Sequence, residues 1–368
     1  MEMSIRTIED IVIRETRVCD RTAWLSFIHR RGQSRATKFE HLIRCKGAIR
    51  DVVSLKDNQP SQALRAEINW LQMPNHHLIP ITDPNYPERL RHIPDPPLLL
   101  YAIGDIGLLS QPQIAIVGSR KPTPIGHKCA EQIAQELASF GLIVTSGMAL
   151  GIDGIAGRAA LSVAQGKSIA VLAHGLDTVY PLSNQRLFKQ LCSCGLVISE
   201  YPIGVGPTKY RFPERNRIVS GLSLGVVIVE AAERSGTLVT ARLALEQSRE
   251  LMVVPGSALS AQYRGSHRLI QQGAAVVCSA QDIIQCLASD LQYVLKSISQ
   301  PENGLADAMD LNIKVNPLLQ YVGAESTSID DIIQASGLSA AEVSSALLSM
   351  ELQGQIAVTR DGGFVNLR

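Results

Sequence analysis

The sequence has few aromatic residues and almost no net charge. Phenylalanine, tryptophan and tyrosine make up 4% of the 368 residues, so any stacking of nucleobases must rest on a small number of side chains. There are 35 lysines and arginines against 34 aspartates and glutamates, which gives a net charge of +1. A polyanionic ligand would therefore have to bind at a local basic patch, because there is no overall basic field.

Metal-ligand spacing and long apolar runs are also missing. The seven cysteines are scattered, and only Cys192 and Cys194 lie close together, which indicates reduced thiols in apolar gaps. The N-terminus carries no apolar run of signal-peptide length, and no later segment approaches the roughly 20 apolar residues of a membrane span. We therefore expect a soluble, cytoplasmic protein without a bound metal.

Neither standard phosphate-loop code is present. The stretch "IAIVGSRKPTPIG" (114–126) begins like a nucleotide-binding strand and loop, but no G-x-G-x-x-G follows it and no G-x-x-x-x-G-K-[ST] occurs anywhere. This disfavours a dinucleotide dehydrogenase and a P-loop ATPase. No Ser-His-Asp or Cys-His order stands out either, and His174 is a lone histidine. The carboxylates in or beside the predicted loops are Asp153, Asp177, Glu200 and Glu230.

From Gln113 to about Asp290, short apolar runs alternate with helical stretches. The predicted strands are 114–117, 142–146, 168–173, 196–199, 224–230, 251–255 and 274–277. The predicted helices between them are 127–140, 153–164, 184–192, 215–222, 237–249 and 266–272. Continuous apolar strands separated by helices are typical of a doubly wound, mainly parallel sheet. We therefore predict an α/β fold for 113–290.

The flanking segments have other patterns. Short helical periodicity, with Trp24 and Trp70 among its apolar positions, predicts a helical domain of SAM or helix-hairpin-helix type over 1–75. Prolines crowd the segment 76–112, which we expect to be a connector with little regular structure before Leu98. A linker is predicted for 291–318. The order helix, turn, helix and hairpin predicts a winged helix over 319–368.

The second helix of this winged helix has an unusual composition for a DNA reader. The segment 339–352 contains no lysine or arginine but does contain Glu342 and Glu351. A helix that reads the major groove normally presents Arg, Lys, Asn or Gln. We expect this domain to contact protein, or to touch DNA only through the wing at Arg360.

The loops that follow the predicted strands are rich in Gly, Ser and Thr. In an open parallel sheet, ligands collect outside the carboxyl ends of the strands, and small residues there let backbone N–H groups approach an anion. Ser235, Gly236 and Thr237 form the strongest candidate, with Ser235 predicted to cap the following helix. The prolines of "GSRKPTP" stiffen the first loop, so that Arg120 and Lys121 are presented from a rigid arm.

A second basic cluster, "KYRFPERNR" (209–217), interleaves cations with aromatic rings. Charge for the backbone and flat faces for the bases are what a single nucleic-acid strand requires. There is a structural alternative. Arg215 and Arg217 could instead form salt bridges with Glu214 or Glu200, and Phe212 could belong to the core.

Several motifs together are familiar. In order and spacing they resemble the DNA-processing protein family DprA, also called Smf. The motifs are "AIVGSRKPTPIG", "VTSGMALGIDGIAGRAAL", "IAVLAHGLDTVYPLSN", "FPERNRIVSGLS", "VVIVEAAERSGTLVTARLALEQSRELMVVPG" and "GSHRLIQQGAAVV". The resemblance runs from about Trp24 to Ile284, and the C-terminal winged helix is similar to a tail that many members carry.

The resemblance implies a function. Members of this family bind single-stranded DNA taken up during natural transformation, protect it, and load the recombinase RecA on it. The family has an extended Rossmann-like domain, is usually dimeric, and has neither catalytic activity nor a required cofactor. For this chain we therefore expect no enzyme activity, no cofactor, and single-stranded DNA, RecA and a second copy of the chain as partners.

The resemblance also implies a binding site. Arg120, Arg215 and Arg217 would hold phosphates, and Phe212 would stack on a base. The remaining positions carried over from the family motifs are Gly118, Ser119, Ser146, Gly147 and Asn216. Several positions depart from the common pattern. In the second motif, Leu150 stands where an arginine is usual and Gly157 where a histidine is common.

Two other functions remain open from the sequence. One is a nucleotide phosphoribohydrolase of the lysine-decarboxylase-like group, which uses a Pro-Gly-Gly-x-Gly-Thr loop with a Glu and an Arg. Here Arg234-Ser235-Gly236-Thr237 replaces that loop, and the paired Arg and Glu are not evident. The other is a scaffold that merely dimerises.

Overall fold

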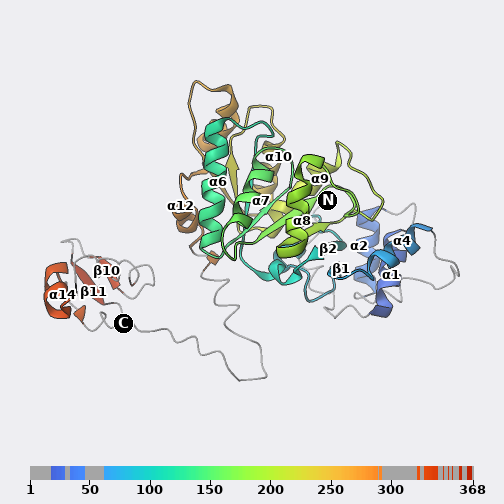
Figure 1. The fold of residues 1–368 in the computed structure, drawn as a ribbon, viewed down its shortest axis with the longest axis horizontal. Coiled ribbons are helices and arrows are strands. Elements are labelled where there is room, and N and C mark those ends of the chain that lie inside the picture. The colour runs from blue at the N-terminus through green and yellow to red at the C-terminus, as the bar shows by residue number, and fades with distance from the viewer. Residues whose placement is uncertain are drawn as a thin grey trace, which may run out of the picture. The chain divides into compact units, whose positions relative to one another are not determined.

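The chain forms two compact units, Met1–Gln300 and Pro301–Arg368, each with its own hydrophobic core (Figure 1). The computed structural model describes residues 18–29, 34–45, 62–288, 290–291, 321–323, 327–338, 343, 347, 350, 356–358 and 363–366. Over these residues, no helix is both long enough and apolar enough to cross a membrane.

A nine-stranded sheet organises the first unit, in the order β1-β2-β6-β5-β4-β3-β7-β8-β9. The strands are β1 His76–Pro80, β2 Leu99–Gly104, β3 Gln113–Gly118, β4 Ile143–Ser146, β5 Ser168–Leu172, β6 Leu196–Ser199, β7 Gly225–Val229, β8 Glu250–Val254 and β9 Ala275–Val276. Strands β3 to β9 pair in parallel, and β1 and β2 add antiparallel pairs at one edge. The predicted α/β class with a mainly parallel sheet is confirmed.

Helices cover both faces of this sheet. Ile114 and Ile116 of β3 pack with helices α6 (Pro124–Ser139) and α7 (Ile152–Ser162). Ala115 and Val117 belong to the core that contains α9 (Arg211–Leu222) and α10 (Thr237–Glu246). This division follows from the two-residue period of a strand, which sends alternate side chains to opposite faces. Figure 1 shows α6, α7 and α8 in a row in front of the sheet. The helices are α6 Pro124–Ser139, α7 Ile152–Ser162, α8 Gln185–Cys194, α9 Arg211–Leu222, α10 Thr237–Glu246, α11 Arg264–Gln271 and α12 Ala280–Cys286.

The strand order reverses at β3. From β3 the chain continues through β4, β5 and β6 on one side, then returns to place β7, β8 and β9 on the other. The loop after β3 therefore leads to α6 on one face, and the loop after β7 leads to α10 on the opposite face. A crevice opens at the carboxyl ends of two such strands, and ligands of doubly wound sheets bind there.

The described residues of the N-terminal segment form helices, as predicted. The helices are α1 Val18–Ile28, α2 Arg35–Arg44 and α4 Gln62–Trp70. Trp24 and Phe27 meet edge to face with ring centroids 6.1 Å apart, and both are buried. Ser34 caps α2 by accepting a hydrogen bond from the Thr37 N–H. The buried side chains join the core that continues into the sheet.

Strand β1 and the short helix α5 (Glu88–Arg91) lie within the segment expected to have little regular structure before Leu98. That expectation is wrong for both elements. The residues of β1 show no alternation of apolar and polar side chains, and the strand ends at Pro80 among many turn residues. It forms because Leu78 and Ile79 pair with Tyr101 and Leu100 of β2, a long-range contact that no local pattern announces.

The second unit contains α14 Ile329–Ser336 and an antiparallel hairpin of β10 Ile356–Val358 and β11 Phe364–Asn366. Val343, Leu347 and Met350 are helical and buried together with Ile332 and Ile356. The predicted winged-helix order is confirmed. Its Glu342, Glu351 and Arg360 lie outside the described residues, as does nearly all of the predicted linker.

Candidate nucleic-acid interface

A cavity of about 420 Å³ opens at the carboxyl edge of the sheet, between the loops that leave β3 and β7. Its first wall, the β3 wall, is Gly118–Arg120. The facing β7 wall is formed by residues of the segment Ala232–Thr237. The remaining lining residues are Val117, Ala149, Asp153, Lys209, Phe212, Pro213, Arg215, Asn216 and Thr240. The cavity therefore lies at the point where the strand order reverses.

The β3 wall is held close to the sheet. A Cβ atom on Gly118 would lie 1.9 Å from the carbonyl oxygen of Val229, so only glycine fits there. Ser119 Oγ accepts a hydrogen bond from the Lys121 N–H at 3.2 Å. The exposed Arg120 places its guanidinium over the Phe212 ring, 5.3 Å from the centroid. Through this cation–π contact, the cavity lining presents a cation and an aromatic ring side by side.

Arg215 lines the cavity, but the protein itself satisfies most of its donors. It is buried and donates from Nη1 to the carbonyl of Gly147 at 2.7 Å and to that of Val171. Burial lowers the pKa of Arg215, and the neighbouring Asp153 carboxylate opposes this effect. Burial in turn raises the pKa of Asp153, which Arg215 partly offsets. Because both residues are buried and line the cavity, Arg215 and Asp153 form its floor.

Ser146 and Gly147 support this floor and do not line the larger cavity. Ser146 Oγ donates to the Ile116 carbonyl at 2.7 Å. The Gly147 N–H donates to Asp153 Oδ2 at 3.2 Å, and a Cβ at this position would lie 2.4 Å from Arg215 Nη2. A larger residue at this position would therefore displace the Arg215 and Asp153 side chains.

The β7 wall leads into α10. Ser235 Oγ accepts a hydrogen bond from the Thr237 N–H at 3.1 Å. The N-cap of α10 is Gly236, which has no capping side chain, so the prediction that Ser235 is the cap residue is wrong by one position. Arg234 also lines this wall. Because the helix begins inside the wall, its partial positive charge faces the cavity.

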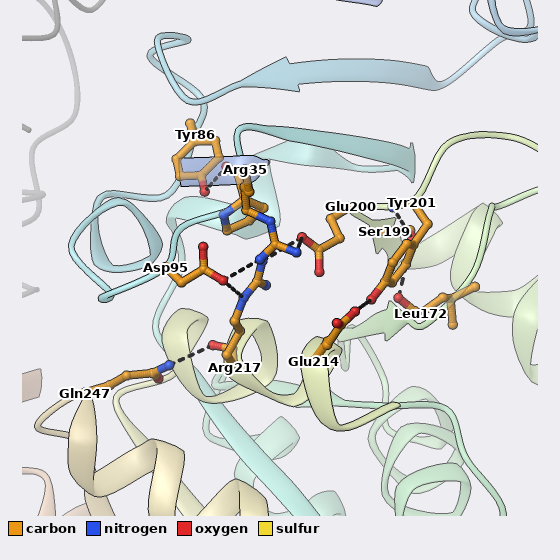
Figure 2. Close-up of polar contacts among 11 residues, drawn as sticks. Arg35, Tyr86, Asp95, Leu172, Ser199, Glu200, Tyr201, Glu214, Arg217 and Gln247 are labelled. Atoms are coloured by element: carbon orange, nitrogen blue, oxygen red, sulfur yellow. Dashed lines mark hydrogen bonds and ion pairs between the residues drawn. The ribbon is translucent and has the colours of Figure 1, made fainter. Parts of the chain in front are cut away.

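Arg217 does not line the cavity. Figure 2 shows its side chain pointing toward Asp95 and Glu200 instead. It donates from Nη2 to Glu200 Oε2 at 2.6 Å and from Nε to Asp95 Oδ2 at 3.1 Å. Arg35 of α2 reaches both carboxylates, at 3.6 Å from Glu200 and at a close contact with Asp95. Burial alone would lower the pKa of Arg217, but the two carboxylates raise it overall. The salt-bridge alternative is therefore observed for Arg217 with Glu200.

A smaller cavity of about 30 Å³ adjoins the first. Arg120 and Phe212 border both cavities. Tyr180 lies 5.8 Å from Phe212 between ring centroids, and His174 lies behind Tyr180 at 6.4 Å. Burial lowers the pKa of His174. Leu150, which replaces the arginine common in the family, is exposed at the rim of this smaller cavity.

Most of the predicted site residues are brought together. Those that line the larger cavity are Gly118, Ser119, Arg120, Phe212, Arg215, Asn216, Ser235, Gly236 and Thr237. Lys121 is exposed beside the cavity without lining it. Lys209 and Arg234, which the candidate set omitted, also line it. Lys209 is the first residue of the second basic cluster, and Arg234 directly precedes Ser235, so the sequence carried a signal for both. Within the described ranges, no group of three or more His, Cys, Asp or Glu residues could hold a metal ion.

Comparison with known proteins identifies close relatives. The family model for DNA recombination-mediator protein A matches residues 77–288, and the DprA winged helix domain matches 306–362. Protein Smf of Escherichia coli K12 is 42% identical over 312 residues, covering 84% of this chain and 82% of its own length. DNA processing protein DprA of Bacillus subtilis is 43% identical over 217 residues, covering 58% of this chain and 73% of its own length.

Solved structures agree with this result. DprA from Streptococcus pneumoniae superposes with a TM-score of 0.58 at 32% identity, covering 77% of this chain and 98% of that one. DNA processing protein A from Helicobacter pylori, described for its single-stranded DNA binding mode, gives 0.51 at 35% identity over 55% of this chain and 93% of that one. The family matches and the sheet with its reversed strand order lead to one conclusion: this chain belongs to the DprA/Smf family of DNA-processing proteins.

Proposed function

We propose that this chain binds single-stranded DNA without sequence preference in the larger cavity. The observation that carries the proposal is the chemistry of the cavity lining. The lining contains one carboxylate, that of Asp153, and four cations, which are Arg120, Lys209, Arg215 and Arg234. Cations would hold the sugar-phosphate backbone, and the Phe212 ring beside Arg120 offers a flat face to a base of any identity.

The relatives support this proposal. The Helicobacter pylori protein is described as binding single-stranded DNA, and the matched family is that of a recombination mediator. We further propose that the bound strand is protected and passed to RecA during natural transformation, by a cytoplasmic homodimer without catalytic activity or a cofactor. Arg217 is left out of the proposed DNA contacts, because two carboxylates already bind it.

The test is a binding titration of a labelled oligo-dT at several salt concentrations. The logarithm of the affinity should fall with the logarithm of salt at about −0.7 per phosphate neutralised. Arg120→Ala should weaken binding by about ten- to a hundredfold, since a charge-assisted phosphate contact is worth about 1.5 to 3 kcal/mol. The control is Arg242→Ala on α10, an exposed arginine that pairs with Glu246 at 3.4 Å. Equal competition by duplex DNA, or normal binding by Arg120→Ala, would contradict the proposal.

RecA loading needs a separate test. On a strand covered by a single-stranded DNA-binding protein, the chain should shorten the lag before RecA hydrolyses ATP. An unchanged lag with intact strand binding would limit the function to DNA binding. Release of free base from nucleoside monophosphates would instead favour the phosphoribohydrolase. If the chain did not retain single-stranded DNA at low salt, the result would favour a scaffold that merely dimerises.

A further inference from the structure

Glu230, the first residue after β7, has an unusual backbone conformation. Its φ is +62°, in the left-handed region that glycine adopts readily and other residues avoid. The residue is fully buried, with a relative exposure of 0%. A glycine would make the same turn without strain, so a buried glutamate at this position is explained only by what its side chain contacts.

The Glu230 side chain reaches across the crevice to the loop that follows β3. Its carboxylate accepts hydrogen bonds from the Thr123 N–H at 2.9 Å and from Thr123 Oγ1 at 2.6 Å. Thr123 caps α6, so the carboxylate lies at the positive end of a 16-residue helix. A Cβ on Gly126 would lie 2.5 Å from Glu230 Oε2, which shows how closely the two segments approach.

These contacts join the two walls of the larger cavity. Thr123 follows the β3 wall, which ends at Arg120, and Glu230 precedes the β7 wall, which begins at Ala232. The start of the β7 wall is also held to α11, because the Ala231 N–H donates to Ser266 Oγ at 3.0 Å. At their base the two walls are already joined by the strand ladder, in which Gly118 pairs with Val229. The bonds between Glu230 and Thr123 add a second link, beyond the ends of the strands.

We propose that Glu230 is a positioning residue for the DNA cavity. Its carboxylate holds Thr123 and so sets the spacing at which the β3 wall and the β7 wall can contact the same phosphodiester group of a DNA strand. This inference rests on the proposed function. It assigns Glu230 no contact with DNA, since the side chain is buried and already bonded to Thr123.

The variant Glu230→Gly tests the contribution of the side chain apart from that of the backbone conformation. The glycine relieves the positive φ and removes the carboxylate, so the chain should stay folded while its affinity for oligo-dT falls about tenfold. The salt slope should also become shallower by about 0.7, the contribution of one phosphate. Glu230→Gln keeps an oxygen that can accept from Thr123 N–H and should retain most of the affinity. The matched control is Ser248→Gly, an exposed residue with φ +55° outside the cavity.

A double variant distinguishes positioning from a general structural effect. If Glu230 acts by holding the β3 wall, Glu230→Gly should cause little further loss once Arg120 is alanine. If Glu230→Gly fails to fold, two variants of Thr123 take its place in the test. Thr123→Val removes the hydroxyl donor, and Thr123→Ser keeps it. Normal oligo-dT binding by Glu230→Gly, or losses that add fully to that of Arg120→Ala, overturns this inference. Failure of the wild-type chain to bind oligo-dT overturns the proposed function instead.

Discussion

Arg215 and Arg217 are only two residues apart on α9, yet they have different surroundings. Arg215 forms part of the cavity floor with Asp153, whereas Arg217 binds Glu200 and Asp95 on the side that faces α2. Residues i and i+2 of a helix point in different directions. One short motif can therefore supply both a ligand site and a structural ion pair.

Arg217→Ala should therefore act on stability. Arg35 remains as a cation 3.6 Å from Glu200, so the loss should stay below the roughly 3 to 5 kcal/mol that a fully broken buried ion pair costs. Urea denaturation should show this loss, whereas Arg120→Ala should be close to the wild type. For the folded variant, the salt slope of oligo-dT binding should not change. A shallower slope at wild-type stability would show that Arg217 contacts phosphate after all.

Leu150 offers a test in the opposite direction. It is 49% exposed at the rim of the smaller cavity, next to the residues that border the larger one. Leu150→Arg would add a cation beside the strand, so the salt slope should become steeper by about 0.7 and the affinity should rise several-fold. Leu245→Arg, on the exposed part of α10, is the control for added charge alone. The same gain in both variants would exclude a local contact.

At this scale the sequence could predict which residues gather but not what each one binds. Arg120 and Phe212 belong to motifs recognised from their order, and both line the cavity. The partners of Arg217 come from the segment around Asp95 and from the end of β6, far away in the chain. The role of Glu230 depends on a φ angle and on a bond to a residue 107 positions away, neither of which leaves a local pattern.

At the scale of elements, strands buried on both faces were predicted well, because apolar runs bounded by glycine and polar loops identify them. Strand β1 was missed, because long-range pairing with β2 specifies it. Helix α9 begins at Arg211, four residues before the predicted start at Arg215. The prediction was late because the first turn contains a proline. Proline fits there, since the first helical N–H groups have no partner within the helix.

Helix α7 allows a paired prediction on two glycines. At Gly157, an added Cβ would lie 3.5 Å from Leu187 Cδ2, which is ordinary contact. Gly157→Ala should therefore raise the free energy of unfolding by about 0.5 to 1 kcal/mol, the helix propensity difference. At Gly154, the Cβ would lie 2.9 Å from Asn184 Nδ2 and 3.0 Å from the Ala149 carbonyl, so Gly154→Ala should destabilise. Equal effects in urea denaturation would contradict this assignment.

At the scale of the whole molecule, the proposed site lies entirely in the first unit. Every residue that lines the larger cavity falls within Met1–Gln300. Deleting 301–368 should therefore leave the affinity for oligo-dT and its salt slope unchanged, while any contribution of the winged helix to RecA loading is lost. A weaker affinity in this deletion would indicate that the second unit contacts the strand.

The cluster of Arg35, Asp95, Glu200 and Arg217 has a consequence for how the protein responds to ionic strength. The Arg217 and Glu200 side chains are only 8% and 7% exposed, so dissolved ions barely screen their attraction. Arg120, by contrast, is open to solvent. Concentrated salt should therefore detach a nucleic-acid strand while the contact between α9 and the end of β6 persists. The protein could then be eluted from immobilised DNA by salt and recovered folded, with nearly the same melting temperature.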